Sequence, residues 1–161
     1  MNLRSLLLII CFTVVAGCQQ PADIDTDFAQ PALASTETSK DFGDYVLHFS
    51  ALSTEQLSPE VARQHDIVRS GNRGLLNVSI IKKEPGALGK SVSGSVSASA
   101  INLTGQLKNI TFREIREEEA IYYIGEAMIS NEETLIFTID ATPINESSRF
   151  TIRYMKQFFV D

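Results

Sequence analysis

Several residue types on which metal centres and common hydrolases depend are scarce in this chain. Its 161 residues include no tryptophan, two histidines and two cysteines. A zinc site needs three or four ligands close together, whereas His48 and His65 lie in separate segments. The stretch SGSVS lacks the second glycine of a nucleophile elbow, G-x-S-x-G. The sequence therefore predicts neither a metal centre nor a serine hydrolase, and it indicates no cofactor.

Basic side chains are also in short supply. The chain has 14 Lys and Arg against 20 Asp and Glu, which gives a formal net charge of −6. Nucleic-acid binding needs a basic footprint, and an electrostatic hold on anionic lipid needs a polybasic cluster. The charge balance argues against both.

Both cysteines lie near the N-terminus, in a segment that is typical of targeting. Arg4 gives it a positive start, and residues 6–15 form an apolar run that is too short to span a bilayer. Val15-Ala16-Gly17-Cys18 resembles the lipobox of bacterial lipoproteins. We therefore expect residues 1–17 to be a signal peptide, and Cys18 to carry covalent lipid. An ordinary secretory signal with an incidental cysteine is the alternative.

Lipidation would determine the cellular location of the protein and would leave its fold without a disulfide. Cys11 would leave with the signal peptide, so the mature chain could form no disulfide. Gln19 follows the cysteine, whereas lipoproteins retained at the inner membrane often have aspartate there. We therefore expect an outer-membrane lipoprotein that faces the periplasm, with its lipid as the membrane anchor.

The mature chain divides into a linker and a single domain. Residues 18–40, CQQPADIDTDFAQPALASTETSK, contain two prolines and several small residues without apolar periodicity. That composition is typical of a flexible tether. Residues 41–161 are long enough for one hydrophobic core.

Alternation of apolar and polar residues dominates residues 41–161. Leu76, Val78 and Ile80 share one face of a predicted strand, with Asn77 and Ser79 opposite. Comparable segments are 44–52, 91–100, 106–115, 120–129, 133–141 and 149–159. We predict an all-β, immunoglobulin-like sandwich of about seven antiparallel strands, or alternatively a small barrel.

Two details modify this pattern. One short helix is expected where Ser58 can act as the N-cap and Pro59 can take the first helical position. Alternate serines from Ser91 to Ser99 share one face, but Ile101 and Leu103 then fall on that face. We interpret this change as a β-bulge near residues 99–102 or as a strand that changes sheets.

Three stretches carry a family resemblance: FGDYVLHFSAL (42–52), RSGNRGLLNVSI (69–80) and IYYIGE (121–126). Together with the lipobox and the closing KQFFVD, they resemble an uncharacterised family of small Gram-negative envelope proteins, a domain of unknown function. The resemblance implies a secreted or lipid-anchored β-rich domain. It implies no catalytic residues.

The best candidate for a binding site is RSGNRG. Arg69 and Arg73 flank a turn that contains Gly71 and Asn72, and Arg63 lies shortly before. Such a loop can direct guanidinium and backbone N–H groups at an anion or a partner. The alternative is structural: Arg73 would then brace the loop by pairing with Asp41 or Asp44.

Other polar features have simpler interpretations. The serine face reads as a solvated strand face. The run Glu117–Glu119, with Glu114 nearby, reads as a solvated hairpin turn because calcium loops space their carboxylates differently.

We therefore predict a binding or adaptor module for an envelope protein partner, engaged through an edge strand or loops. A small-ligand or lipid carrier with a cavity between its sheets is the alternative. An enzyme is the least favoured class, because no nucleophile–base pair is visible. The sequence indicates no oligomeric state.

Overall fold

The computed structural model describes residues 31, 32, 34 and 36–160. The predicted signal peptide, Cys18 and most of the predicted tether lie outside these residues. In chain order the described elements are β1 (Ser39–Asp41), β2 (Tyr45–Ser53), η2 (Thr54–Gln56), α1 (Pro59–Gln64), β3 (Arg73–Lys82), β4 (Lys90–Ser91), β5 (Gly94–Asn102), β6 (Leu107–Ile110), β7 (Phe112–Glu117), β8 (Ala120–Met128), β9 (Thr134–Pro143) and β10 (Phe150–Gln157).

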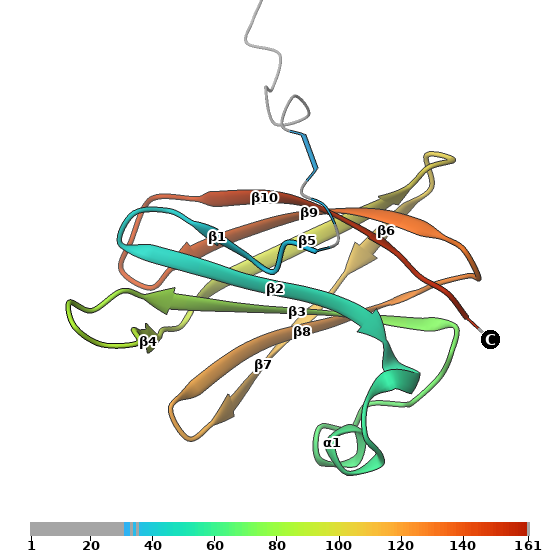
Figure 1. The fold of residues 1–161 in the computed structure, drawn as a ribbon, viewed down its shortest axis with the longest axis horizontal. Coiled ribbons are helices and arrows are strands. Elements are labelled where there is room, and N and C mark those ends of the chain that lie inside the picture. Colours follow the sequence, from blue (N-terminus) through green and yellow to red (C-terminus); the bar gives the residue numbers. More distant parts are fainter. Residues whose placement is uncertain (1–30, 33, 35, 161) are drawn as a thin grey trace, which may run out of the picture. The chain divides into compact units, whose positions relative to one another are not determined.

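The strands form two antiparallel sheets (Figure 1). The first sheet has the order β1-β2-β3-β8-β7, with β4 beside β3, and the second has the order β10-β9-β5-β6. Seven of these described strands have six or more residues. Their orders, β2-β3-β8-β7 and β10-β9-β5, match the ABED and GFC sheets of a constant-type immunoglobulin domain. The predicted sandwich is confirmed, and it is not a closed barrel.

Strict alternation places the core between the sheets. Every second residue of β9 is buried, from Leu135 to Pro143, and β2 alternates in the same way. Aromatic rings join the two layers: the centroids of Phe49 and Tyr154 lie 5.0 Å apart, edge to face. Buried apolar side chains contribute roughly 1.5–3 kcal/mol each, so this core can stabilise the described domain, which contains no cysteine.

The prediction of a β-bulge near residues 99–102 is wrong. β5 keeps one register against β9 from Gly94 opposite Pro143 to Asn102 opposite Leu135. Ile101 continues the serine face and is simply exposed there, as is Leu103 beyond the strand. A single exposed apolar residue on a strand needs no break in pairing.

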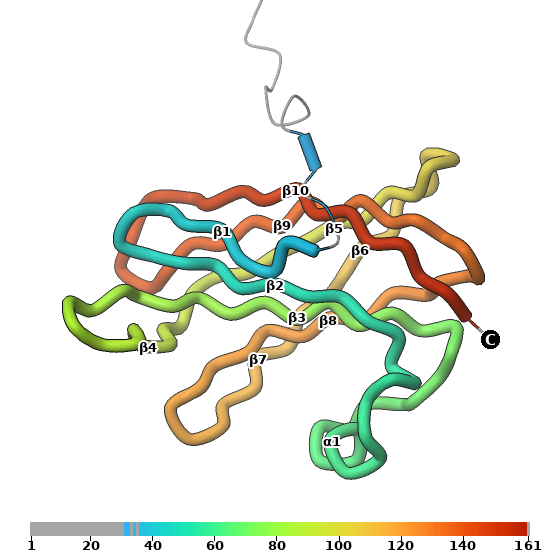
Figure 2. Tube along the Cα trace, viewed as in Figure 1, coloured from blue at the N-terminus to red at the C-terminus, as the bar shows by residue number. Residues whose placement is uncertain are grey.

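The chain changes sheets one strand later. β6 pairs with β5 in the second sheet, whereas β7 pairs with β8 in the first, and Figure 2 shows the trace running from one sheet to the other. Ile110 is buried in the core between the sheets, and Phe112 packs against this core. Gly125 lies opposite Phe112, where a Cβ atom would come within 2.4 Å of Ile110 Cγ2. The crossing therefore depends on a residue without a side chain.

The segment between β2 and β3 packs on the outer face of the first sheet. The Ser58 hydroxyl accepts a hydrogen bond from the Val61 N–H, and Pro59 begins α1, which confirms the predicted helix and its cap. A second apolar cluster forms beneath this segment from Ala62, Ile67, Leu75 and Ile124.

Candidate functional site

The predicted arginine loop follows α1 and leads into β3. Arg69 Nη2 donates a hydrogen bond to the Glu55 carbonyl oxygen at 2.8 Å. The Ser70 hydroxyl donates to Asn72 Oδ1 at 2.5 Å, and the Ser70 N–H donates to Thr54 Oγ1. The loop is therefore fixed against η2 by its own polar groups.

Arg73 takes part in a structural contact, but not with the expected acid. Its Nη1 lies 3.0 Å from Glu126 Oε2 across the β3–β8 pair. The predicted alternative partner Asp41 instead pairs with Lys83 at 2.5 Å. Asp41 and Asp44 lie before Tyr45, the first residue of β2, whereas Arg73 lies beside Ser53, the last residue of that strand. The suggestion that Asp41 or Asp44 braces Arg73 is therefore wrong. Arg73 Nε is buried and has no hydrogen-bond partner among the described residues.

Asn72 also borders a hollow of about 730 Å³, which we call the amide pocket. Its backbone carbonyl accepts a hydrogen bond from the Ile129 N–H, which ties the loop to the end of β8. The pocket is lined by Asn72, Gln106, Lys108, Asn109, Glu126, Ala127, Met128, Ile129, Ser130, Asn131 and Val160. The structure thus joins one predicted site residue to three further side-chain amides: Gln106 just before β6, Asn109 in β6, and Asn131 in the loop after β8.

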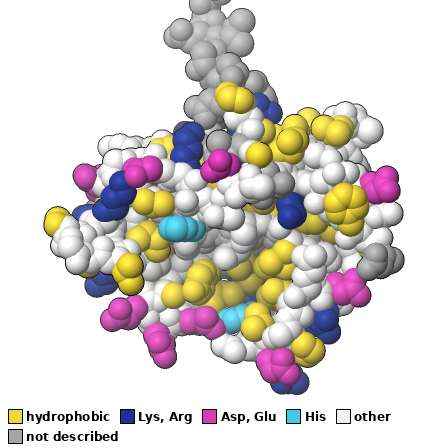
Figure 3. Space-filling model, viewed as in Figure 1, with side chains coloured by type: hydrophobic (Ala, Val, Ile, Leu, Met, Phe, Trp, Pro, Cys, Tyr) yellow, Lys and Arg dark blue, Asp and Glu magenta, His cyan; other side chains and the backbone are white. Residues whose placement is uncertain are grey.

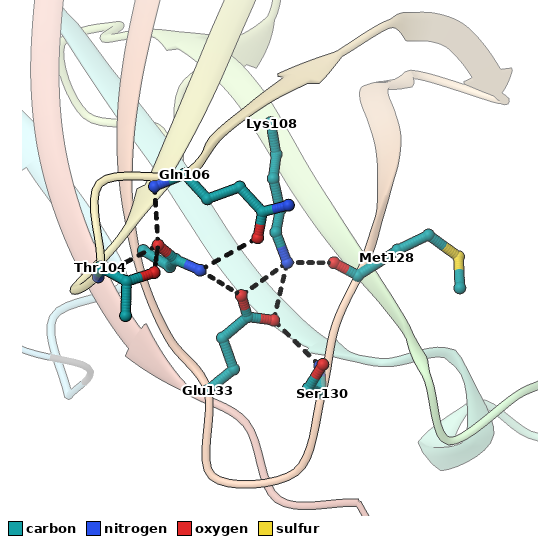
Figure 4. Close-up of polar contacts among 7 residues, drawn as sticks. Thr104, Gln106, Lys108, Met128, Ser130 and Glu133 are labelled. Atoms are coloured by element: carbon teal, nitrogen blue, oxygen red, sulfur yellow. Dashed lines mark hydrogen bonds and ion pairs between the residues drawn. The ribbon is translucent and has the colours of Figure 1, made fainter.

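One wall of the amide pocket is a polar network (Figure 4). Lys108 Nζ lies 2.7 Å from both carboxylate oxygens of Glu133 and donates to the Met128 carbonyl oxygen. Asn102 Nδ2 and the Ser130 N–H donate to the same carboxylate, each at 2.9 Å. The side chains of Lys108 and Glu133 are only 14% and 10% exposed. Sequence reasoning missed this network because its partners come from separate strands and a loop.

The surroundings of Glu133 act on its ionisation in opposite directions. Burial alone would raise its pKa, because it disfavours the charged form. Hydrogen bonds from Lys108, Asn102 and the Ser130 N–H outweigh burial and hold the pKa of Glu133 below its usual value. Glu133 therefore neutralises Lys108, and the pocket presents amides rather than net positive charge.

The side chains of this site can form hydrogen bonds with a neighbouring molecule. Side-chain amides both donate and accept hydrogen bonds, as peptide groups do. No cluster of three or more His, Cys, Asp or Glu that could hold a metal ion occurs among the described residues. Within the same part of the chain, no helix is long and apolar enough to cross a membrane.

The remaining candidates have structural roles. Glu118 and Glu119 form the turn between β7 and β8, as expected for a hairpin, and Glu118 has a φ of 49°. His48 is exposed on β2, whereas His65 caps α1 and lies 3.1 Å from Glu117.

The serine face is broader than the sequence indicated. Thr142 lies opposite Ser95 in the register of β5 and β9, so a neighbouring strand adds hydroxyl groups to it.

Fold and site together define an immunoglobulin-like sandwich with a pocket lined by side-chain amides. The chain belongs to the family described as Domain of unknown function (DUF4426), whose model matches residues 39–161. A crystal structure of a DUF4426 family protein, PA0388 from Pseudomonas aeruginosa PAO1, is similar, with 35% sequence identity and a TM-score of 0.66. That match covers 76% of this chain and 94% of the other.

A more distant structure has the same fold. FetP of uropathogenic E. coli strain F11, recombinantly expressed in the periplasm of E. coli BL21(DE3), has 12% identity and a TM-score of 0.55. The match covers 76% of this chain and 93% of FetP. No curated protein is significantly similar to this chain.

Proposed function

We propose that this protein is a lipid-anchored binding module of the bacterial envelope. It is attached to the outer membrane through Cys18, faces the periplasm, and engages a protein partner at Arg69, Asn72, Arg73 and the adjoining amide pocket. The observation that carries the proposal is the position of this pocket beside the loop, with its wall already fixed by the Lys108–Glu133 network. A wall held in place loses little freedom when a partner binds.

The amides favour a peptide partner over an anion. Asn72, Gln106, Asn109 and Asn131 all line the pocket. The side-chain oxygens of Asn72, Gln106 and Asn131 already accept hydrogen bonds within the domain, so these three amides offer chiefly their NH₂ groups to a peptide carbonyl. The charged groups beside them are already paired within the domain, Lys108 with Glu133 and Arg73 with Glu126. A partner therefore meets a neutral, hydrogen-bonding surface.

A carrier with a cavity between its sheets is less well supported. The space between the sheets is occupied by side chains that are 0% exposed, among them Leu47, Val78, Ile80, Leu135 and Ile152. Interiors packed in this way leave few voids larger than a water molecule.

In-cell crosslinking of the lipidated protein, followed by mass spectrometry, tests the proposal. We expect one reproducible envelope protein that is lost in an Arg69→Glu/Arg73→Glu variant. Because Arg73 pairs with Glu126, Arg73→Glu alone is also compared with Arg73→Glu/Glu126→Arg, which restores an ion pair with its charges exchanged. If Arg73 touches the partner, the exchanged pair folds normally but still fails to crosslink.

The same experiment can reject the proposal. Full recovery of crosslinking in the exchanged pair would show that Arg73 only braces β3 against β8. The absence of any partner in the unmodified protein would exclude an adaptor role and direct attention to small ligands.

A further inference from the structure

A second hollow lies on the outer face of the first sheet, between α1 and strands β2, β3, β8 and β7. We call it the apolar groove. Its volume is about 210 Å³, and its apolar walls include Leu52, Leu57, Val61, Ile67, Ile115 and Tyr122. Figure 3 shows hydrophobic side chains gathered in a depression on this face. It shares no lining residue with the amide pocket.

The size of the groove limits what it can hold. Pockets for whole small molecules usually measure about 300–1,000 Å³, whereas a cavity of about 150 Å³ accepts a group the size of benzene. The groove therefore suits one apolar side chain of a larger partner rather than a whole ligand.

One polar atom on the wall of the groove has no hydrogen-bond partner among the described residues. Ser50, Asn77 and Ile124 lie side by side across β2, β3 and β8. Asn77 Oδ1 is buried and has no hydrogen-bond partner among the described residues. An unpaired buried oxygen costs about 1–3 kcal/mol, so a donor that arrives with an apolar side chain would be favoured. A peptide N–H beside that side chain is such a donor.

The rim of the groove is acidic. Glu117 lines both the groove and an adjoining hollow, which also contains Glu118. Glu117 Oε1 already accepts a hydrogen bond from Gln64 Nε2 and lies 3.1 Å from His65 Nε2, so Oε2 is the oxygen that can receive a further partner. Of the described residues that line these two hollows, none is lysine or arginine. The nearby Arg113 donates a hydrogen bond to the His65 carbonyl oxygen and so holds the end of α1. The rim therefore complements positive charge.

We propose that the apolar groove binds a basic peptide segment of a partner protein. An aliphatic side chain fills the groove, the adjacent peptide N–H donates to Asn77 Oδ1, and flanking lysine or arginine side chains pair with Glu118 and with Glu117 Oε2. This site is separate from the loop and amide pocket of the proposed function, so either can fail without the other.

The test uses the full lipidated chain in nanodiscs of phosphatidylcholine, a lipid without net charge that does not itself attract a basic peptide. The probe is a short peptide in which lysine alternates with photoreactive leucine, and its counterpart carries glutamate in place of lysine. Binding is measured by fluorescence anisotropy, and photo-crosslinks are mapped by mass spectrometry. We expect the lysine peptide alone to bind, with crosslinks at residues that line the groove.

Matched variants separate the groove from the general surface. Val61→Arg places a cation at the mouth of the groove, and we expect it to weaken binding about ten-fold or more, equivalent to about 1.4 kcal/mol. Val68→Arg is its control, because Val68 is 60% exposed and does not line the groove.

Two charge-reversal variants, one on the rim and one outside it, test the role of the rim. Glu118→Lys reverses a rim charge in the exposed β7–β8 turn, and we expect about a three-fold or larger loss, because exposed charge pairs contribute under about 1 kcal/mol. Glu84→Lys makes the same exchange in an exposed turn outside the groove and should leave binding unchanged.

Three results would overturn the proposal: no binding at millimolar peptide, equal binding of the glutamate peptide, or crosslinks confined to residues outside the groove. A variant in the amide pocket, Asn109→Ala, should leave peptide binding intact, because Asn109 is exposed and does not line the groove. A loss there would place the peptide at the amide pocket and not in the groove.

Discussion

Among single side chains, Lys108 is the one whose replacement we expect to cost most outside the apolar core. Lys108→Met leaves the largely buried carboxylate of Glu133 without its cation, and breaking a buried pair in this way costs about 3 kcal/mol. The measurement is the free energy of unfolding in urea. Lys83→Met is the matched control, because Lys83 and Asp41 are 44% and 63% exposed. A loss no larger than in the control would show that the network does not stabilise the fold.

The same carboxylate predicts how stability depends on pH. The folded state lowers the pKa of Glu133 below the ordinary value of 4.5. Its contribution is therefore fully present above that value and is lost as the pH falls through the lower, folded-state pKa. We expect the urea concentration at the unfolding midpoint to decrease when the pH is lowered below about 4.5. The decrease should be less steep in Glu133→Gln, whose side chain cannot titrate. Parallel curves for the two proteins would contradict this assignment.

At the level of the strands, the crossing from β6 to β7 requires a residue without a side chain at position 125, which the sequence pattern does not indicate. Gly125→Ala would bring a methyl group within 2.4 Å of Ile110 Cγ2, and overpacking of this kind costs about 1–3 kcal/mol. Ile110→Ala removes the clashing atom, so the double variant should lose less than the sum of the two single losses. Strict additivity in urea unfolding would reject the contact.

The crossing also shows where sequence periodicity stops being informative. Ile110 and Phe112 both point toward the core, and an uninterrupted strand would place them on one face as well. The period of two is the same in either case, so it could not reveal the change of sheets. The N-cap at Ser58 and the turn at Glu118 were predictable because each is decided by adjacent residues.

The site was only partly predictable for a related reason. Asn72 was identified from its own loop, but the amides that join it come from distant segments of the chain. Lys108 and Glu133 are 25 positions apart and meet only because the ends of β6 and β8 converge. The apolar groove needs α1 folded over a sheet face, which no local pattern specifies.

For the whole molecule, we expect the proposed lipid on Cys18 and the fold to be independent, because the core contains no cysteine in the described residues. Cys18→Ser is therefore expected to abolish metabolic labelling with palmitate and to remove the protein from the outer-membrane fraction. The matched control is Cys11→Ser, which removes the other cysteine of the chain and should change neither result. Urea unfolding of the domain should be the same in all three proteins. Persistent labelling of Cys18→Ser would reject this residue as the anchor.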